Sequence, residues 1–289
     1  MKRALVFFLL AACGAKSTPP AEPAPPPFKP TAFSVQVSGQ GRPILFIPGL
    51  ACGGDVWDGT VAHFGGKVQA HVLTLAGFAG EKPIPPPFLP TVRKEIAAYI
   101  RANRLDHPVV VGHSLGAAMT FWLAETEPDL IGRAVAVDGL PFFPAVQRAG
   151  ATAADAEPQA KMLRDQFAAV PPGGMGPPLR QFLGTMITRP ADLDRVLARA
   201  EKSDPASTGQ ALYELFTTDL RPDLPKIRAP MLIVAATDLA VPRAMLEAGW
   251  HSQIDAVPVK QLVFVEGAKH FVMLDQPDRF YALLDEFLK

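Results

Sequence analysis

Short apolar runs alternate with helical stretches along most of this chain, and this order strongly limits the folds open to it. Continuous apolar strands that are connected through helices predict an α/β fold, in which a mostly parallel central sheet is flanked by helices. The first run alternates polar and apolar residues, which is typical of an edge strand. The predicted strands are residues 33–37, 44–47, 71–75, 109–111, 134–137, 231–234 and 261–265, and the clearest predicted helices are residues 91–102, 115–125 and 280–287.

A long segment after the fifth predicted strand departs from this alternation. From Leu140 to about Arg221 no run has the character of a strand, and apolar residues such as Phe167 and Phe182 recur at helical spacing. We interpret this segment as a helical cap inserted over one end of the sheet. The predicted domains are therefore a first part of the α/β core at 32–140, a cap at 141–221 and a second part of the core at 222–289.

The first 31 residues have the character of an export signal followed by a spacer. Lys2 and Arg3 precede an apolar run too short to span a bilayer, and the run ends in L-A-A-C at Cys13. This ending resembles the lipobox of bacterial lipoprotein signal peptides. The resemblance implies cleavage after residue 12, lipidation of Cys13 and a place in the bacterial cell envelope, anchored to a membrane and exposed to the periplasm or exterior. A plain secretory signal is the alternative. The proline-rich residues 13–31 predict an extended linker.

Composition excludes some classes of function. Lysines and arginines equal aspartates and glutamates at 28 each, so net charge offers no reason to expect a nucleic-acid partner. Only two cysteines occur, which excludes a disulfide scaffold, and we interpret Cys52 as a small packed residue. No residues have the spacing of a metal-ligand cluster, and the expected cofactor is none.

The stretch V-V-V-G-H-S-L-G-A-A, residues 109–118, carries the strongest functional signal. It places Ser114 between two glycines, where a predicted strand meets a predicted helix. This is the context of a nucleophile elbow, in which a tight turn presents a serine hydroxyl above the carboxyl end of the sheet. The alternative is that Ser114 merely caps the helix.

A serine nucleophile needs a base, and the base needs an acid that orients it. His270 follows the last predicted strand and is the expected base. Asp238 follows the strand before it and is the preferred acid, whereas Asp138, at the end of A-V-A-V-D, is the alternative. We interpret Asp275 and Asp278 as caps of the final helix because they follow the histidine closely.

These residues, together with F-I-P-G-L at 46–50, resemble the α/β-hydrolase superfamily from about residue 33 to residue 289, apart from the cap. The resemblance implies a catalytic triad of Ser114, Asp238 and His270. It also implies an oxyanion hole formed by the backbone N–H groups of Leu50 and Leu115. Many members have a histidine where this chain has Pro48, so the resemblance supports the role of Leu50 less strongly than that of Leu115.

The predicted function is hydrolysis of a small-molecule carboxylic ester through an acyl-enzyme. The same triad serves thioesterases, amidases, lactonases and acyltransferases, and these activities stay open as alternatives. The alternative outside the enzymes is a surface-tethered binding protein that has the same fold but no catalytic activity.

Overall fold

The computed structural model describes residues 28–148, 150–171, 173–237 and 241–289. Within these residues seven strands form one sheet, and every predicted strand coincides with one of them. The fold class expected from the sequence is confirmed. The strands are β1 Phe33–Ser38, β2 Arg42–Ile47, β3 Val68–Leu75, β4 Val109–His113, β5 Arg133–Val137, β6 Met231–Ala236 and β7 Lys260–Val265.

The sheet has the strand order β1-β3-β2-β4-β5-β6-β7, and only β1 runs antiparallel to its neighbour. The other strands are parallel, so their carboxyl ends meet at one edge. At this edge the register pairs His113 with Val137, which brings the residues that follow β4 and β5 close together.

Helices cover both faces of the sheet. Because side chains alternate along a buried strand, Leu45 and Ile47 join one apolar cluster while Ile44 and Phe46 join the other. The main helices outside the cap are α1 Asp58–Phe64, α2 Phe88–Ala102, α3 Leu115–Thr126, α9 Arg243–Ile254, α10 Val272–Asp275 and α11 Pro277–Phe287, with short 3-10 helices η1 Gly54–Trp57 and η2 Arg221–Lys226.

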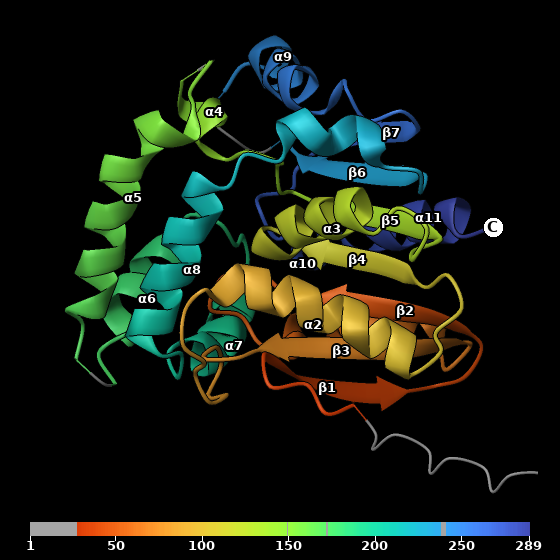
Figure 1. The fold of residues 1–289 in the computed structure, drawn as a ribbon, viewed down its shortest axis with the longest axis horizontal. Helices are drawn as coiled ribbons and strands as arrows, with labels where there is room; N and C mark the ends of the chain where they lie inside the picture. Colours follow the sequence, from red (N-terminus) through yellow and green to blue (C-terminus); the bar gives the residue numbers. More distant parts are fainter. Residues whose placement is uncertain (1–27, 149, 172, 238–240) are drawn as a thin grey trace, which may run out of the picture.

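Among the described residues, five α-helices between β5 and β6 form the cap, and Figure 1 shows α5 to α8 beyond the carboxyl ends of the parallel strands. Thr152 and Asp155 form a capping box that starts α5, and α5 packs closely along α8. The cap therefore stands over the edge where the expected site residues converge. Its helices are α4 Pro144–Gln147, α5 Ala153–Ala168, α6 Gly176–Gly184, α7 Pro190–Ala200 and α8 Pro205–Thr217.

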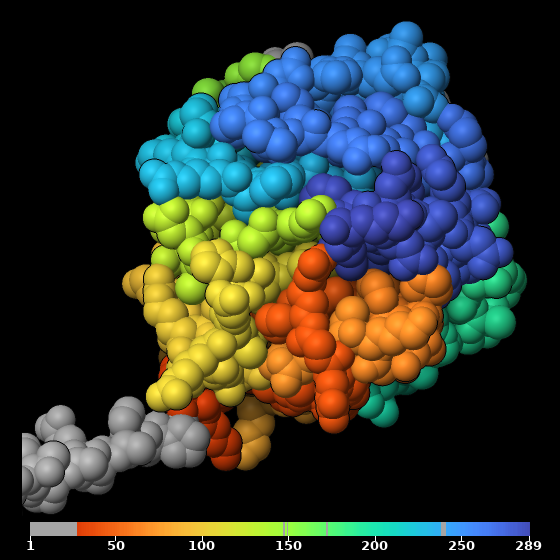
Figure 2. Space-filling model, turned by 90° about the vertical axis from the view of Figure 1, so that its right-hand side faces the viewer, coloured from red at the N-terminus to blue at the C-terminus, as the bar shows by residue number. Residues whose placement is uncertain are grey.

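The C-terminal end of the chain lies on the face away from the cap. In Figure 2 the dark blue C-terminal residues lie against red and orange residues of the N-terminal part of the chain. Arg42 and Arg133 fasten this end, because their guanidinium groups donate hydrogen bonds to the carbonyls of Leu288 and Phe287. No helix in the described part of the chain has the length and apolar character needed to cross a membrane.

Candidate active site

Ser114 occupies the strand–turn–helix geometry that the sequence predicted. It lies between β4 and α3 with φ 57° and ψ −116°, a conformation that a residue with a side chain adopts only under strain. The two neighbouring glycines allow the tight turn. A Cβ on Gly112 would lie 1.9 Å from the carbonyl oxygen of Gly116, and one on Gly116 would lie 2.3 Å from that of Ile47. Side chains at these positions are therefore incompatible with the elbow.

The loop that follows β5 packs directly on the elbow. The backbone N–H of Ser114 donates a hydrogen bond of 2.9 Å to the carbonyl of Val137. The next residue, Asp138, has φ 45°, and its own N–H donates to the carbonyl of Val234 at 2.8 Å. Asp138 is thus held between β5 and β6, directly after Val137, whose carbonyl accepts the hydrogen bond from Ser114.

The Asp138 carboxylate has two partners. Oδ1 accepts a hydrogen bond of 2.9 Å from the N–H of Ala236, and Oδ2 lies 2.6 Å from Nδ1 of His270. An ionised carboxylate can only accept, so Nδ1 of His270 carries the proton and Nε2 has its lone pair free. The side chains of Asp138 and His270 are 12% and 21% exposed, so bulk water weakens this contact little.

This pairing bears on the choice between the two candidate acids. The sequence favoured Asp238, which lies outside the described residues, and ranked Asp138 second. In the structure the carboxylate on the imidazole is that of Asp138, because its strand ends beside β6 and its strained backbone directs the side chain towards His270. The signal was present in the sequence, since A-V-A-V-D places an aspartate at the end of a buried strand.

His113 contacts the backbone of His270 from inside the core. Its ring is fully buried, and its Nε2 lies 3.0 Å from the backbone carbonyl oxygen of His270. Since a carbonyl only accepts, Nε2 of His113 is the protonated nitrogen. Burial, and secondarily the proximity of His270, holds the pKa of His113 well below its usual value. His113 therefore stays neutral and acts as a donor that fixes the backbone at position 270.

The residue that precedes Ser114 contacts His270 directly. The His113 ring, which immediately precedes Ser114, lies 4.7 Å from the His270 ring between centroids. No direct hydrogen bond between the Ser114 hydroxyl and the His270 ring is present among the described contacts. In enzymes without substrate such bonds are often long, and they tighten when substrate binds.

The two backbone amides expected to bind an oxyanion flank the elbow. The β2–η1 loop approaches Ser114 closely, since a Cβ on Gly49 would lie 3.2 Å from the Ser114 Cβ. In the described part of the chain, neither the N–H of Leu50 nor that of Leu115 donates a hydrogen bond to another protein group. Two unpaired donors beside a nucleophile are what an oxyanion hole requires.

Cys52, in the same loop, is not a competing nucleophile. Its side chain is buried, and burial, with a smaller contribution from Asp55, raises the pKa of its thiol to about 12. A thiol in this state carries almost no thiolate at neutral pH. The interpretation of Cys52 as a packed residue agrees with this environment.

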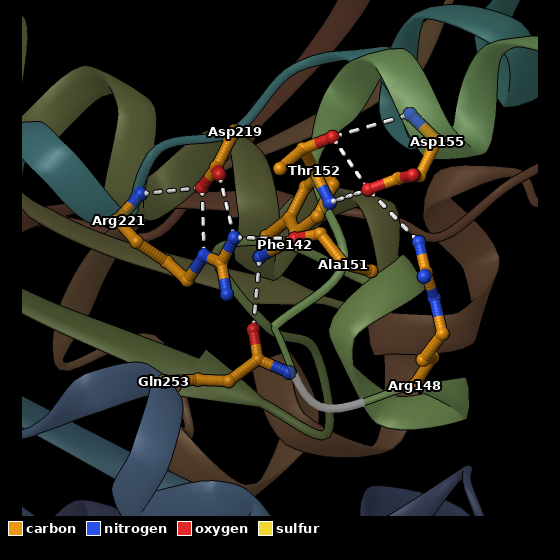
Figure 3. A network of polar contacts seen from close by, with 8 residues as sticks. All are labelled: Phe142, Arg148, Ala151, Thr152, Asp155, Asp219, Arg221 and Gln253. Atoms are coloured by element: carbon orange, nitrogen blue, oxygen red, sulfur yellow. Dashed lines mark hydrogen bonds and ion pairs between the residues drawn. The ribbon is translucent and has the colours of Figure 1, made fainter.

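A polar network fastens the point where the chain leaves the core for the cap and returns from it (Figure 3). The Arg221 guanidinium pairs with both oxygens of Asp219 at 2.8 and 2.7 Å and donates to the carbonyl of Ala151 at 2.9 Å. It also lies 4.6 Å from the centre of the Phe142 ring, and the N–H of Phe142 donates to Gln253 of α9. The segment after Asp138 is thereby held to the core through Phe142 and Gln253, and to Arg221 through Ala151 at the start of the cap.

The remaining histidines make local contacts away from this site. Each pairs with a residue near it in space and not with Ser114 or His270: His63 with Asp285, His71 with Tyr99, His107 with Asp106 and His251 with Asp255. Among the residues that the structure describes, no group of three or more potential ligands gathers to hold a metal ion.

The chain resembles known hydrolases over most of its length. The sequence model of the "Alpha/beta hydrolase family" matches residues 44–283. A pimeloyl-[acyl-carrier protein] methyl ester esterase of Nitrosomonas europaea is 25% identical over 88% of this chain and 98% of its own length. The N-formylmaleamate deformylase of Pseudomonas putida is 24% identical over 88% of this chain and 91% of its own length.

Solved structures show the same architecture. An esterase from Thermogutta terrifontis superposes with a TM-score of 0.74 at 18% identity and covers 89% of this chain and 92% of its own. The enol-lactonase from Burkholderia xenovorans superposes with a TM-score of 0.72 at 19% identity and covers 89% and 96%. At these identities the likeness concerns the fold.

Proposed function

Because the chain belongs to the alpha/beta hydrolase family, we propose that it is a serine hydrolase that cleaves a carboxylic ester through an acyl-enzyme intermediate. The observation that carries this proposal is the 2.6 Å contact between Asp138 and His270 beside a strained serine elbow. The acid in this proposal is Asp138, in place of the Asp238 that the sequence favoured.

In the first half of the reaction the Ser114 hydroxyl attacks the acyl carbon of the ester. Nε2 of His270 takes the hydroxyl proton, while Asp138 holds the ring through Nδ1 and stabilises the imidazolium that forms. The carbonyl oxygen gains negative charge, and the N–H groups of Leu50 and Leu115 receive it. The tetrahedral intermediate then collapses, and His270 passes the proton to the oxygen of the departing alcohol.

In the second half of the reaction, water takes the part of the nucleophile and the Ser114 oxygen becomes the leaving group. His270 removes a proton from a water molecule, and the resulting hydroxide attacks the acyl carbon on Ser114. The second tetrahedral intermediate releases the acid and returns the proton to the Ser114 oxygen. One ester and one water thus give one acid and one alcohol, and the enzyme is restored.

The Ser114→Ala variant tests the assignment of the nucleophile. It should lose nearly all turnover of p-nitrophenyl esters and all labelling by a fluorophosphonate probe, while its circular dichroism stays unchanged. Full activity of the variant would refute the proposal. A wild-type protein that neither turns over esters nor reacts with the probe would instead indicate the binding-protein alternative.

A small apolar cavity near the elbow is the candidate place for an apolar group on the acyl side of the ester. The cavity has a volume of about 10 Å³, and its lining includes Leu115, the residue after Ser114, but not Ser114, Asp138 or His270. This volume holds roughly one water molecule, so an acyl chain enters only when side chains or the cap move apart. Its lining comes from α2, α3, the loop after Asp138 and the cap: Leu89, Leu115, Ala118, Met119, Trp122, Pro141, Leu215, Thr218 and Leu220.

Amide hydrolysis is the second candidate, because one relative is named as a deformylase. Parallel assays with methyl esters, thioesters, lactones and N-formyl amides that carry the same acyl group would rank these reactions by kcat/KM. Added alcohols would reveal acyl transfer as a second product.

We also propose that Cys13 carries a lipid anchor that holds the enzyme in the cell envelope. The support is sequence alone: a charged start, a short apolar run and a cysteine at its end, all outside the described residues. Each buried CH₂ of an acyl chain contributes about 0.8 kcal/mol of membrane affinity. Radioactive palmitate should label the full-length protein, and the Cys13→Ser variant should lose that label and leave the membrane fraction.

A further inference from the structure

Asp275 lies between the loop that carries His270 and the cap. Its Oδ2 accepts a hydrogen bond of 2.8 Å from the N–H of Lys269, the residue directly before His270. Its Oδ1 accepts a hydrogen bond of 3.1 Å from the N–H of Thr188, in the cap between α6 and α7. The sequence suggested that Asp275 caps the final helix, but α11 begins after Gln276, and the Asp275 carboxylate faces these two amides instead.

Three consecutive residues around the base are tethered through their backbone. Lys269 is held by Asp275, the carbonyl of His270 is held by the buried ring of His113, and the N–H of Phe271 donates to the carbonyl of Met186 at 3.4 Å. Two of these three tethers lead to the cap, one directly through Met186 and one through Asp275.

The same part of the cap makes further contacts with the core around the site. Arg189 donates a hydrogen bond of 2.7 Å to the carbonyl of Leu274, and Arg195 donates one of 3.1 Å to the carbonyl of Asp55. Asp55 belongs to η1, which follows the loop of Leu50. The cap residues 186–195 therefore contact two parts of the core. One is the segment around His270, and the other is η1, which follows the loop of Leu50.

We propose that Asp275 is a positioning residue that couples docking of the cap to the placement of His270. One carboxylate joins the amide next to the base with an amide of the cap, so neither segment can shift without loss of a charge-assisted hydrogen bond. When the cap is docked, His270 is held for proton transfer, and when the cap lifts, the base loop loosens with it. This inference rests on the proposed serine hydrolase function.

The chemistry of the side chain allows a sharp test. An ionised carboxylate accepts from both amides, whereas an asparagine has one carbonyl oxygen and an NH₂ group that cannot accept. Asp275→Asn keeps the size and loses one of the two bonds, and Asp275→Ala loses both. Asp278, exposed in the first turn of α11, supplies the matched control Asp278→Asn.

Kinetics with a p-nitrophenyl ester should follow this gradation. We expect kcat to fall roughly 10-fold in Asp275→Asn and up to about 100-fold in Asp275→Ala, because a shift of about 1 Å in a catalytic group can cost 10²-fold. Asp278→Asn should match the wild type. A rise in KM with kcat unchanged would indicate a purely structural latch of the cap and would overturn the proposal.

Hydrogen–deuterium exchange provides a readout that needs no substrate. In Asp275→Asn, amides of both segments 186–200 and 268–276 should exchange faster than in the wild type, while those of α5 should not change. Faster exchange in segment 268–276 alone would contradict coupling to the cap. If Ser114→Ala retained activity, the proposed function would fail, and the exchange result would still decide whether the two segments are linked.

A double-variant cycle tests the coupling itself. Arg189→Met removes a cap-side bond to the carbonyl of Leu274 without altering the bond to Lys269. If the two residues act through one docked arrangement, the double variant should lose less kcat than the product of the two single losses. Losses that multiply would show two independent effects and refute the coupling.

Discussion

The Oδ2 atom of Asp138 lies 2.6 Å from Nδ1 of His270, and its Oδ1 is held at the same time by the N–H of Ala236. The Asp138 carboxylate is therefore anchored to the strand next to its own while it holds the His270 ring. Because the same carboxylate is bound on both oxygens, the imidazole it holds has one defined tautomer and one defined direction.

Removal of this carboxylate should disable the base. Asp138→Asn keeps the shape of the side chain but can impose the wrong tautomer on His270, and we expect kcat to fall about 10⁴-fold. The matched control is Asp238→Asn, which should retain most of the activity. Steady-state kinetics with a p-nitrophenyl ester would check both variants, and a severe loss in Asp238→Asn with little loss in Asp138→Asn would reverse the assignment.

The glycine before the elbow should not tolerate a methyl group. A Cβ at Gly112 would lie 1.9 Å from a backbone oxygen, so we expect Gly112→Ala to destabilise the fold by more than about 3 kcal/mol, beyond the usual cost of overpacking. Gly249, inside α9 with open space around it, is the control. Gly249→Ala should raise stability by up to about 1 kcal/mol. Urea unfolding would measure both, and equal stabilities would refute the tight turn.

Enlargement of the cavity beside Leu115 should change the preferred length of the acyl chain. Leu215→Ala removes bulk from the cap wall of the cavity, and kcat/KM should shift towards longer p-nitrophenyl esters. Leu193→Ala is a matched control, because Leu193 is also a partly buried cap leucine but does not line the cavity. Each change should cost about 1–2 kcal/mol, less than at a fully buried leucine. An unchanged chain-length profile in Leu215→Ala would place the acyl group elsewhere.

Glu125, buried in α3 under η2, should make stability depend on pH. Burial is the main cause that raises the pKa of its carboxyl to about 8, followed by the nearby Asp223; Lys226 and Arg93 oppose this shift, and Asp219 adds to it weakly. The folded state then binds a proton that the unfolded state has already lost, so this carboxyl destabilises the fold as pH rises from about 4.5 to about 8.

Glu125→Gln should remove this dependence. The variant should match the wild type at about pH 3, well below the unfolded-state pKa of 4.5, where the acid is protonated in both states, and it should have a higher Tm at pH 8.5. Each kcal/mol of difference corresponds to roughly 2–4 °C for a protein of this size class. Thermal unfolding at a series of pH values would measure the effect, and parallel Tm curves for the two proteins would contradict it.

Local sequence patterns predicted the strands and the elbow because those features depend on neighbouring residues. A buried parallel strand needs a continuous apolar run, and the turn at Ser114 needs glycine at positions 112 and 116, so both leave a signature of a few residues. The expectation that His270 ends up at the carboxyl edge of the sheet followed from the same reasoning.

The choice of the acid and the link through Asp275 depended on the tertiary structure. Asp138 and Asp238 both follow apolar strands, and chain order does not say which carboxylate reaches the imidazole. That depends on the strained backbone at Asp138 and on the pairing of β5 with β6. Asp275 likewise contacts Thr188, 87 positions earlier in the chain, only because the cap folds back onto the base loop. The sequence by itself determined the strands and the serine elbow. Contacts between distant segments decided how the His270 ring is oriented, because a hydrogen bond depends on distances in space that local patterns do not encode.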